Sequence, residues 1–191
     1  MTEVSSLTGR LLVATPKLAD PNFDRAVVLV LEHDAKGSIG VVLNRPTPVG
    51  VGDVLQPWAA LAVLPQVVFQ GGPVSLDSAL GLAVVPGESR GEPVEVLGWR
   101  RVHGAIGLVD LDAPPELLAA ELGSLRIFAG YSGWGAGQLE RELTGGAWYV
   151  VDSEPGDVSA PDPERLWRAV LRRQRNKLAM VATYPDDPSL N

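Results

Sequence analysis

The chain has 191 residues, of which 46% are hydrophobic and 20% charged, with a formal net charge of −7 and no cysteine. This composition is that of a globular protein with a well-filled core, and the missing cysteines exclude disulfides and thiolate chemistry. The negative charge argues against specific nucleic-acid binding, because neutralising phosphates supplies most of that affinity. No apolar run approaches the roughly 20 residues that span a bilayer, and no signal-peptide pattern opens the chain. We therefore expect a cytoplasmic protein that does not bind membranes.

The N-terminal half predicts strands joined by short turns. Runs rich in valine and leucine, bounded by proline, aspartate or asparagine, predict strands at 11–15, 26–32, 38–44 and 67–70. A hairpin loop is expected at 33–37. Pro46 and Pro48 are expected to end the third strand, because proline cannot donate to a ladder. Helical spacing predicts a helix over 53–64, which Pro57 keeps short or broken.

The C-terminal half continues this pattern. Further apolar runs predict strands at 81–85, 94–97, 105–109, 126–130 and 147–151. Short helices are expected at 114–122 and 138–143. Strands outnumber helices and many follow one another directly, which favours a mixed, largely antiparallel sheet with packed helices. We expect an α+β fold, an α/β-type sandwich, in a single domain over residues 1–191 or in one with a smaller flanking lobe.

The last expected helix begins at Pro163, with Asp162 as its N-cap. Its apolar stripe, formed by Leu166, Trp167, Val170 and Leu171, predicts that Trp167 is buried and Arg168 exposed. Residues 163–177 carry six basic side chains against one acidic, which leaves −12 on the rest of the chain. Such a run is typical of a solvated helix face. The alternative is a docking face for a protein partner, formed by Arg165, Arg168 and Arg172.

A glycine-rich segment over 130–138 lies between an expected strand and an expected helix. Glycines let backbone N–H groups approach a ligand and helix N-termini favour negative charge, so an anion cradle is one interpretation. The segment is not a Walker loop, because no Gly-Lys-Ser/Thr follows it. It is not a dinucleotide fingerprint either, because Gln138 stands where that motif requires a third glycine. The structural alternative is a tight turn in which Trp134 fills the core. The candidate ligand-binding residues are Gly130, Ser132, Gly133, Trp134, Gly135, Gly137 and Gln138.

Ser132 comes within one residue of the Gly-x-Ser-x-Gly elbow that exposes a nucleophile at a strand-to-helix turn. Trp134 occupies the position where that elbow needs a small residue, which argues against a triad of Ser132 with His33 or His103. The two histidines show no metal-ligand spacing, so we expect neither a metal site nor a cofactor.

A second wall of a pocket is predicted from two turns that follow strands. One carries Asn44, Arg45 and Pro46, and the other carries Gly71, Gly72 and Pro73. Arg45 would supply the positive charge for an anionic ligand, since guanidinium groups match carboxylate and phosphate geometry.

Four segments together resemble the AlgH/YqgE family of bacterial proteins. They are GRLLVATP with DPNF (residues 9–23), AVVL through EHD to GSIGVVLNRP (26–46), GGPV (71–74) and GYSGWGAGQLE (130–140), followed by Glu142 and Trp148. Ser38 and Ser132 stand where the family often has alanine. The resemblance implies a compact α/β protein without a recognised DNA-binding domain. The family carries an old label as a transcriptional regulator and no established enzyme activity.

These features lead to three hypotheses of function. The first is a non-enzymatic protein that binds a small anionic ligand, or regulates, through the predicted pocket. The second is an enzyme that acts on a phosphorylated or acylated small molecule at the same place. The third is a protein-interaction module that uses the basic face of the last helix.

Overall fold

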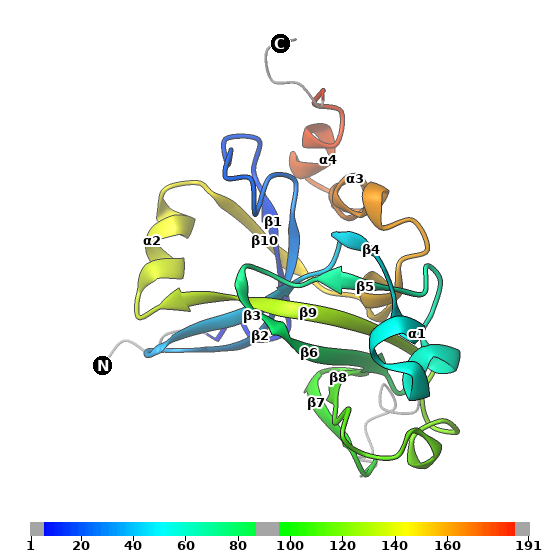
Figure 1. Cartoon of the computed structure of the whole chain (residues 1–191). Coiled ribbons are helices and arrows are strands. Elements are labelled where there is room, and N and C mark those ends of the chain that lie inside the picture. Colours follow the sequence, from blue (N-terminus) through cyan, green and yellow to red (C-terminus); the bar gives the residue numbers. More distant parts are fainter. Residues whose placement is uncertain (1–5, 87–95, 186–191) are drawn as a thin grey trace.

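The computed structural model describes residues 6–86 and 96–185, which form one curled sheet of ten strands with short helices around it (Figure 1). The strands are β1 (Arg10–Ala14), β2 (Val27–Asp34), β3 (Gly37–Val42), β4 (Pro46–Gly50), β5 (Val67–Gln70), β6 (Val74–Val84), β7 (Trp99–His103), β8 (Ile106–Val109), β9 (Ser124–Gly135) and β10 (Trp148–Asp152). The α-helices are α1 (Val51–Val54), α2 (Gln138–Thr144), α3 (Leu166–Arg172) and α4 (Leu178–Val181). The 3-10 helices are η1 (Gln56–Leu61), η3 (Pro115–Leu117), η4 (Pro155–Ser159) and η5 (Pro163–Arg165).

The strand order through the described residues is β10-β1-β2-β3-β9-β6-β8-β7, with β4 and β5 off this path. Each of these strand pairs is antiparallel except β5 with β9, which is parallel. β9 is the longest strand, and it pairs with β3, β5 and β6. The expected mixed, largely antiparallel sheet is confirmed, and strands dominate over helices.

β1 and β2 are buried on both faces of the sheet. Alternate residues point to opposite sides of a strand, so each strand contributes to two cores. Leu11 and Leu29 pack in the same core as the α3 stripe, whereas Leu12 and Val28 pack with Leu139 of α2. This double burial explains why the two strands read as continuous apolar runs. A third core lies under α1 and η1, against β5, β6, β8 and β9.

Two strand boundaries were predicted wrongly. Pro46–Gly50 forms β4 instead of ending a strand, because β4 pairs only with β5 and proline is tolerated at a sheet edge. β9 runs on to Gly135, so residues 131–135 are strand and not loop. The ladder continues through these glycines because β3 pairs with them up to the match of Gly37 with Gly135.

Several smaller expectations also changed. The helix over 53–64 is broken, as expected, into α1 and η1. The helix expected at 114–122 is reduced to η3 with turns. The strand expected at 94–97 lies partly outside the described residues, and its described part is not strand. The strand β7 was not predicted. None of the described helices has the length and apolar character needed to cross a bilayer.

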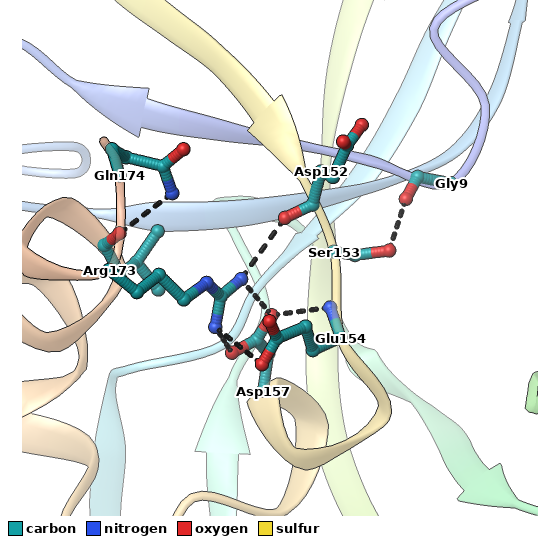
Figure 2. Close-up of polar contacts among 8 residues, drawn as sticks. Gly9, Asp152, Ser153, Glu154, Asp157, Arg173 and Gln174 are labelled. Atoms are coloured by element: carbon teal, nitrogen blue, oxygen red, sulfur yellow. Dashed lines mark hydrogen bonds and ion pairs between the residues drawn. The ribbon is translucent and has the colours of Figure 1, made fainter. Parts of the chain in front are cut away.

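The last helix is interrupted, starting with η5, continuing as α3 and resuming as α4. Asp162 makes no side-chain cap bond but forms an ion pair with Arg165 at 3.2 Å. Figure 2 shows the polar contacts of Arg173, which directly follows α3. Its guanidinium forms a bidentate pair with Asp157 of η4 at 2.6 and 2.7 Å and donates to the carbonyl of Asp152 in β10. The hydrogen bonds to Asp157 raise the pKa of Arg173.

Candidate functional site

Two hollows of about 330 and 140 Å³ lie on either side of the Arg45 side chain, and we call them together the Arg45 cleft. The larger hollow is lined by Arg25, Asn44, Arg45, Pro46 and Glu164. The smaller is lined by Pro21, Asn22, Val42, Arg45, Gln70, Gly72 and Pro73. The cleft thus brings together both of the turns predicted to form a pocket wall.

Asn44 holds the backbone that leads into β2. Its side-chain oxygen accepts a hydrogen bond from Val27 N–H at 3.0 Å, and its amide donates to the Arg25 carbonyl at 2.9 Å. Between these two bonds Arg25 adopts a left-handed conformation with φ 57°. This conformation is unfavourable for a residue with a long side chain and persists only where the surroundings enforce it. Asn44 therefore acts in the site by positioning Arg25.

The Arg25 guanidinium is fixed over a hydrophobic surface. Its Cζ lies 4.1 Å from the centre of the Trp167 ring, in a cation–π stack. Nη2 donates to the Pro185 carbonyl, while Nη1 is buried and has no hydrogen-bond partner within residues 6–86 and 96–185. A buried donor without a partner costs free energy, so the position of this guanidinium is imposed by the packing around it.

Arg45 is the second cation of the cleft. Its Nη2 donates to the Asp24 carbonyl. Burial lowers the pKa of Arg45, an effect partly offset by the Asp24 carboxylate, but an arginine remains protonated in either case. Among the described residues, neither Arg25 nor Arg45 forms an ion pair. Two partly desolvated positive charges therefore share one cleft.

The glycine turn after β5 packs directly against β9. A Cβ on Gly71 would lie 2.4 Å from the Gly130 carbonyl oxygen, and one on Gly72 would lie 2.2 Å from that of Tyr131. The Gly71 carbonyl accepts bonds from Val42 N–H and from the Ser132 hydroxyl. Glycine is required here by the close approach of two backbones, and this approach sets the wall of the smaller hollow.

The remainder of the glycine-rich segment does not line the cleft. Trp134 is 5% exposed, stacks on Phe23 and meets Trp148 edge-to-face, as the structural alternative expected. Gly133 and Gly135 lie in β9, where they pair with β3. Gln138 accepts from Gly135 N–H and donates to Glu142, so both ends of its amide are used within the protein.

Gly137 precedes α2 with φ 73°, a left-handed conformation. Any side chain at this position strains the turn whether or not a ligand binds.

Ser132 does not have the surroundings of an exposed nucleophile. It lies inside β9 and not at a strand-to-helix turn, is 0% exposed and donates to the Gly71 carbonyl at 3.1 Å. His103 is exposed at the end of β7. His33 is buried, and its ring contacts Ser38 and Glu140. The hypothetical triad of Ser132 with a histidine is therefore not assembled.

The three arginines expected to form the basic face of the last helix differ in exposure. Arg165 and Arg172 are exposed, but Arg168 is half-buried, lies 5.6 Å from the Trp167 ring centre and donates to the Ala182 carbonyl. The expectation of an exposed Arg168 is thus wrong, whereas a buried Trp167 is confirmed at 2% exposure.

Sequence reasoning missed Arg25, Asn22 and Glu164 as cleft residues. Arg25 gave no signal because its role depends on a left-handed backbone that arginine rarely adopts. Asn22 lay within the DPNF motif, whose aspartate, proline and asparagine are typical turn residues and could have pointed to it. Glu164 reaches the cleft only through the packing of η5, which the sequence does not reveal.

A family model described as AlgH-like matches residues 11–179 of the chain. The chain belongs to the AlgH-like family. A UPF0301 protein from Streptomyces coelicolor is 80% identical over 191 residues, covering all of this chain and 98% of the relative. Another from Mycobacterium tuberculosis is 47% identical over 183 residues, covering 96% and 90% of the two chains.

Two solved structures extend the AlgH-like relationship to three dimensions. A crystal structure of a Corynebacterium diphtheriae protein superposes with a TM-score of 0.87 at 32% identity, covering 96% of this chain and 95% of that one. The solution structure of the AlgH protein from Pseudomonas aeruginosa superposes with a TM-score of 0.66 at 27% identity, covering 97% of each chain. The resemblance noted in the sequence is therefore confirmed.

Proposed function

We propose that this protein binds a small molecule carrying a phosphate or carboxylate group in the Arg45 cleft, as a binding or regulatory protein. The observation that carries the proposal is the pair of guanidinium groups, Arg25 and Arg45, which line one cleft and form no ion pair among the described residues. An oxyanion in the cleft would accept hydrogen bonds from these guanidinium groups and neutralise their charge.

The size and composition of the cleft support a small metabolite as ligand. The larger hollow, at about 330 Å³, falls within the roughly 300–1,000 Å³ typical of small-molecule sites. Arg25 and Arg45 offer guanidinium donors, whereas Pro46 and Pro73 offer apolar surface for the body of the ligand. Asn22 and Gln70 add neutral side chains with hydrogen-bonding groups at the smaller hollow.

Glu164 opposes this binding from across the larger hollow. Its carboxylate is exposed and of the same sign as the ligand, so it repels an anion at short range. Such a residue limits affinity and selects ligands that carry the anionic group on the Arg45 side.

The test is calorimetric and NMR titration with inorganic phosphate, glycerol phosphate, acetyl phosphate and acetate. Arg45→Ala should weaken binding about tenfold or more, because a charge-assisted hydrogen bond contributes about 1.5–3 kcal/mol. Glu164→Gln should strengthen it a few-fold. Arg175→Ala, which removes an equal charge from an exposed position, is the control and should leave affinity unchanged.

Two results would contradict the proposal: no probe binds the folded protein, or Arg45→Ala and Arg175→Ala weaken binding equally. The second result would show that binding depends on the net charge of the protein and not on the position of Arg45. Consumption of a bound acyl or phosphoryl compound during the titration would instead support an enzyme at this site.

A further inference from the structure

A second group of side chains, away from the Arg45 cleft, forms a continuous hydrogen-bonded chain. The β2–β3 hairpin pairs His33 with Ser38 directly across the ladder. His33 Nδ1 lies 2.6 Å from the Ser38 hydroxyl oxygen, and His33 Nε2 lies 3.2 Å from Glu140 Oε1. Glu140 comes from α2, which packs over this end of β3.

The order of donors and acceptors along this chain follows from the chemistry of its ends. A carboxylate only accepts hydrogen bonds, so Glu140 holds the imidazole proton on Nε2. Nδ1 then carries a lone pair, which accepts the proton of the Ser38 hydroxyl. A carboxylate that orients a histidine, which in turn polarises a serine, is the arrangement by which hydrolases activate a nucleophile.

The ring of His33 is shielded, and Ser38 is itself only 5% exposed at the wall of a hollow. Only 1% of the His33 side chain is exposed, so its two hydrogen bonds are not replaced by water. Ser38 lines a hollow of about 270 Å³ together with Glu32, Asp34, Lys36, Gly37, Ile39 and Trp134. Lys36, which lines the same hollow, is the positive charge available to the oxyanion of an acyl transfer.

We propose that Ser38 is a nucleophile activated by His33 and Glu140, which hydrolyses esters with a short acyl group. The Ser38 oxygen bonds to the acyl carbon while its proton passes to His33 Nδ1. The bond from that carbon to the alcohol oxygen then breaks, and the alcohol leaves with the proton from His33. Water attacks the acyl-serine, giving one proton through His33 back to Ser38, and the carboxylic acid is released.

The hollow restricts the substrate. The hollow of about 270 Å³ is also lined by Trp134 and Ile39, which give apolar contact to a short acyl chain. Glu32 and Asp34 at its border disfavour acids, which points to neutral or cationic esters. Because Ser38 stands where the AlgH/YqgE resemblance often has alanine, the activity is assigned to this chain and not to the family.

The experiment uses a small dialkyl fluorophosphonate, which forms a covalent bond with an activated serine, followed by intact-mass measurement and peptide mapping. The wild-type chain should gain one adduct on Ser38 and should hydrolyse p-nitrophenyl acetate. Ser38→Ala should abolish both, and Glu140→Gln should slow both about tenfold or more, because the charge that supports the imidazolium is lost.

Ser132→Ala is the matched control, since it removes another buried serine hydroxyl that contacts no histidine, and it should label normally. Thermal melts establish that each variant is folded. The proposal is wrong if the folded wild-type protein gains no adduct on Ser38, or if Glu140→Gln labels at the wild-type rate. Either result would leave the His33 chain as an attachment of α2 to the hairpin.

Discussion

Trp167 and Arg168 are adjacent in α3. The Trp167 side chain contacts the sheet and two arginine side chains. The Trp167 ring is buried against β1, and its indole N–H donates to the Ala14 carbonyl at 2.8 Å. Arg25 stacks on the same ring, and Arg168 lies near it. Trp167 therefore links the hydrophobic core to the cation of the proposed ligand site.

We expect Trp167→Ala to lower the free energy of unfolding by about 3–5 kcal/mol, as large aromatic truncations in cores do. Arg168→Ala should cost about 1 kcal/mol through its lost bond to α4. Arg172→Ala, at an exposed position, should stay within about 0.5 kcal/mol. Denaturant unfolding measures all three. Equal losses for Arg168→Ala and Arg172→Ala would show that the contact with Ala182 does not stabilise the fold.

The residue scale is also where the sequence was least informative about the site. Arg45 was predicted as a cleft cation because it follows a strand beside a proline. Arg25 was not, since its orientation depends on the amide of Asn44, nineteen residues later in the chain. The pairing of His33 with Ser38 follows from the hairpin turn and could have been predicted from its length.

At the scale of elements, the β5–β6 connection fixes the wall of the Arg45 cleft. β5 pairs with β9 on one side, and β6 pairs with β9 on the other, so the chain must cross over β9 between them. The crossing passes through Gly71 and Gly72, whose backbones contact that of β9. Side chains at these positions would push the two layers apart.

Gly71→Ala should therefore destabilise the protein by about 1–3 kcal/mol, as overpacking in a close-packed region does. Gly156→Ala is the control, because a Cβ there meets nothing within 4 Å and should change stability by less than about 1 kcal/mol. Thermal melting measures the difference. Matching melting temperatures for the two variants would contradict the close approach of Gly71 to Gly130.

The predicted elements differed in how strongly the sequence determined them. β1, β2 and β5 were predicted well because buried strands require apolar side chains on both faces. β4 was missed because its two prolines are permitted only by its position at a sheet edge, which is a tertiary property. The second half of β9 was missed because pairing with β3 outweighs the poor strand propensity of Gly133 and Gly135.

At the scale of the whole molecule, Arg173 joins three parts of the chain through polar contacts. Its guanidinium bridges α3 to η4 and to the end of β10 (Figure 2). Asp157 is 4% exposed and also accepts from Glu154 N–H at 2.7 Å. The C-terminal helices thus reach the Arg45 cleft in a fixed position relative to the sheet.

Arg173→Ala should cost about 3–5 kcal/mol, because it leaves the buried Asp157 carboxylate without its counter-charge. Adding Asp157→Asn to that variant should recover part of the loss, since the uncompensated charge is removed. Arg175→Ala provides an exposed control. If the double variant is no more stable than Arg173→Ala, the cost arises from lost packing and not from the buried charge. Urea unfolding of the four proteins decides between these explanations.

The stack of Arg25 on Trp167 also has an optical consequence. Of the five tryptophans, Trp58 and Trp99 lie in the core under α1, and Trp134 and Trp148 lie beside α2, whereas Trp167 has a guanidinium over its ring. Indole emission responds to charge close to the ring. An anion that engages Arg25 changes the electric field at Trp167 and leaves the fields at the other four nearly unchanged. The chain therefore carries its own fluorescent reporter of occupancy, which Trp167→Phe would silence.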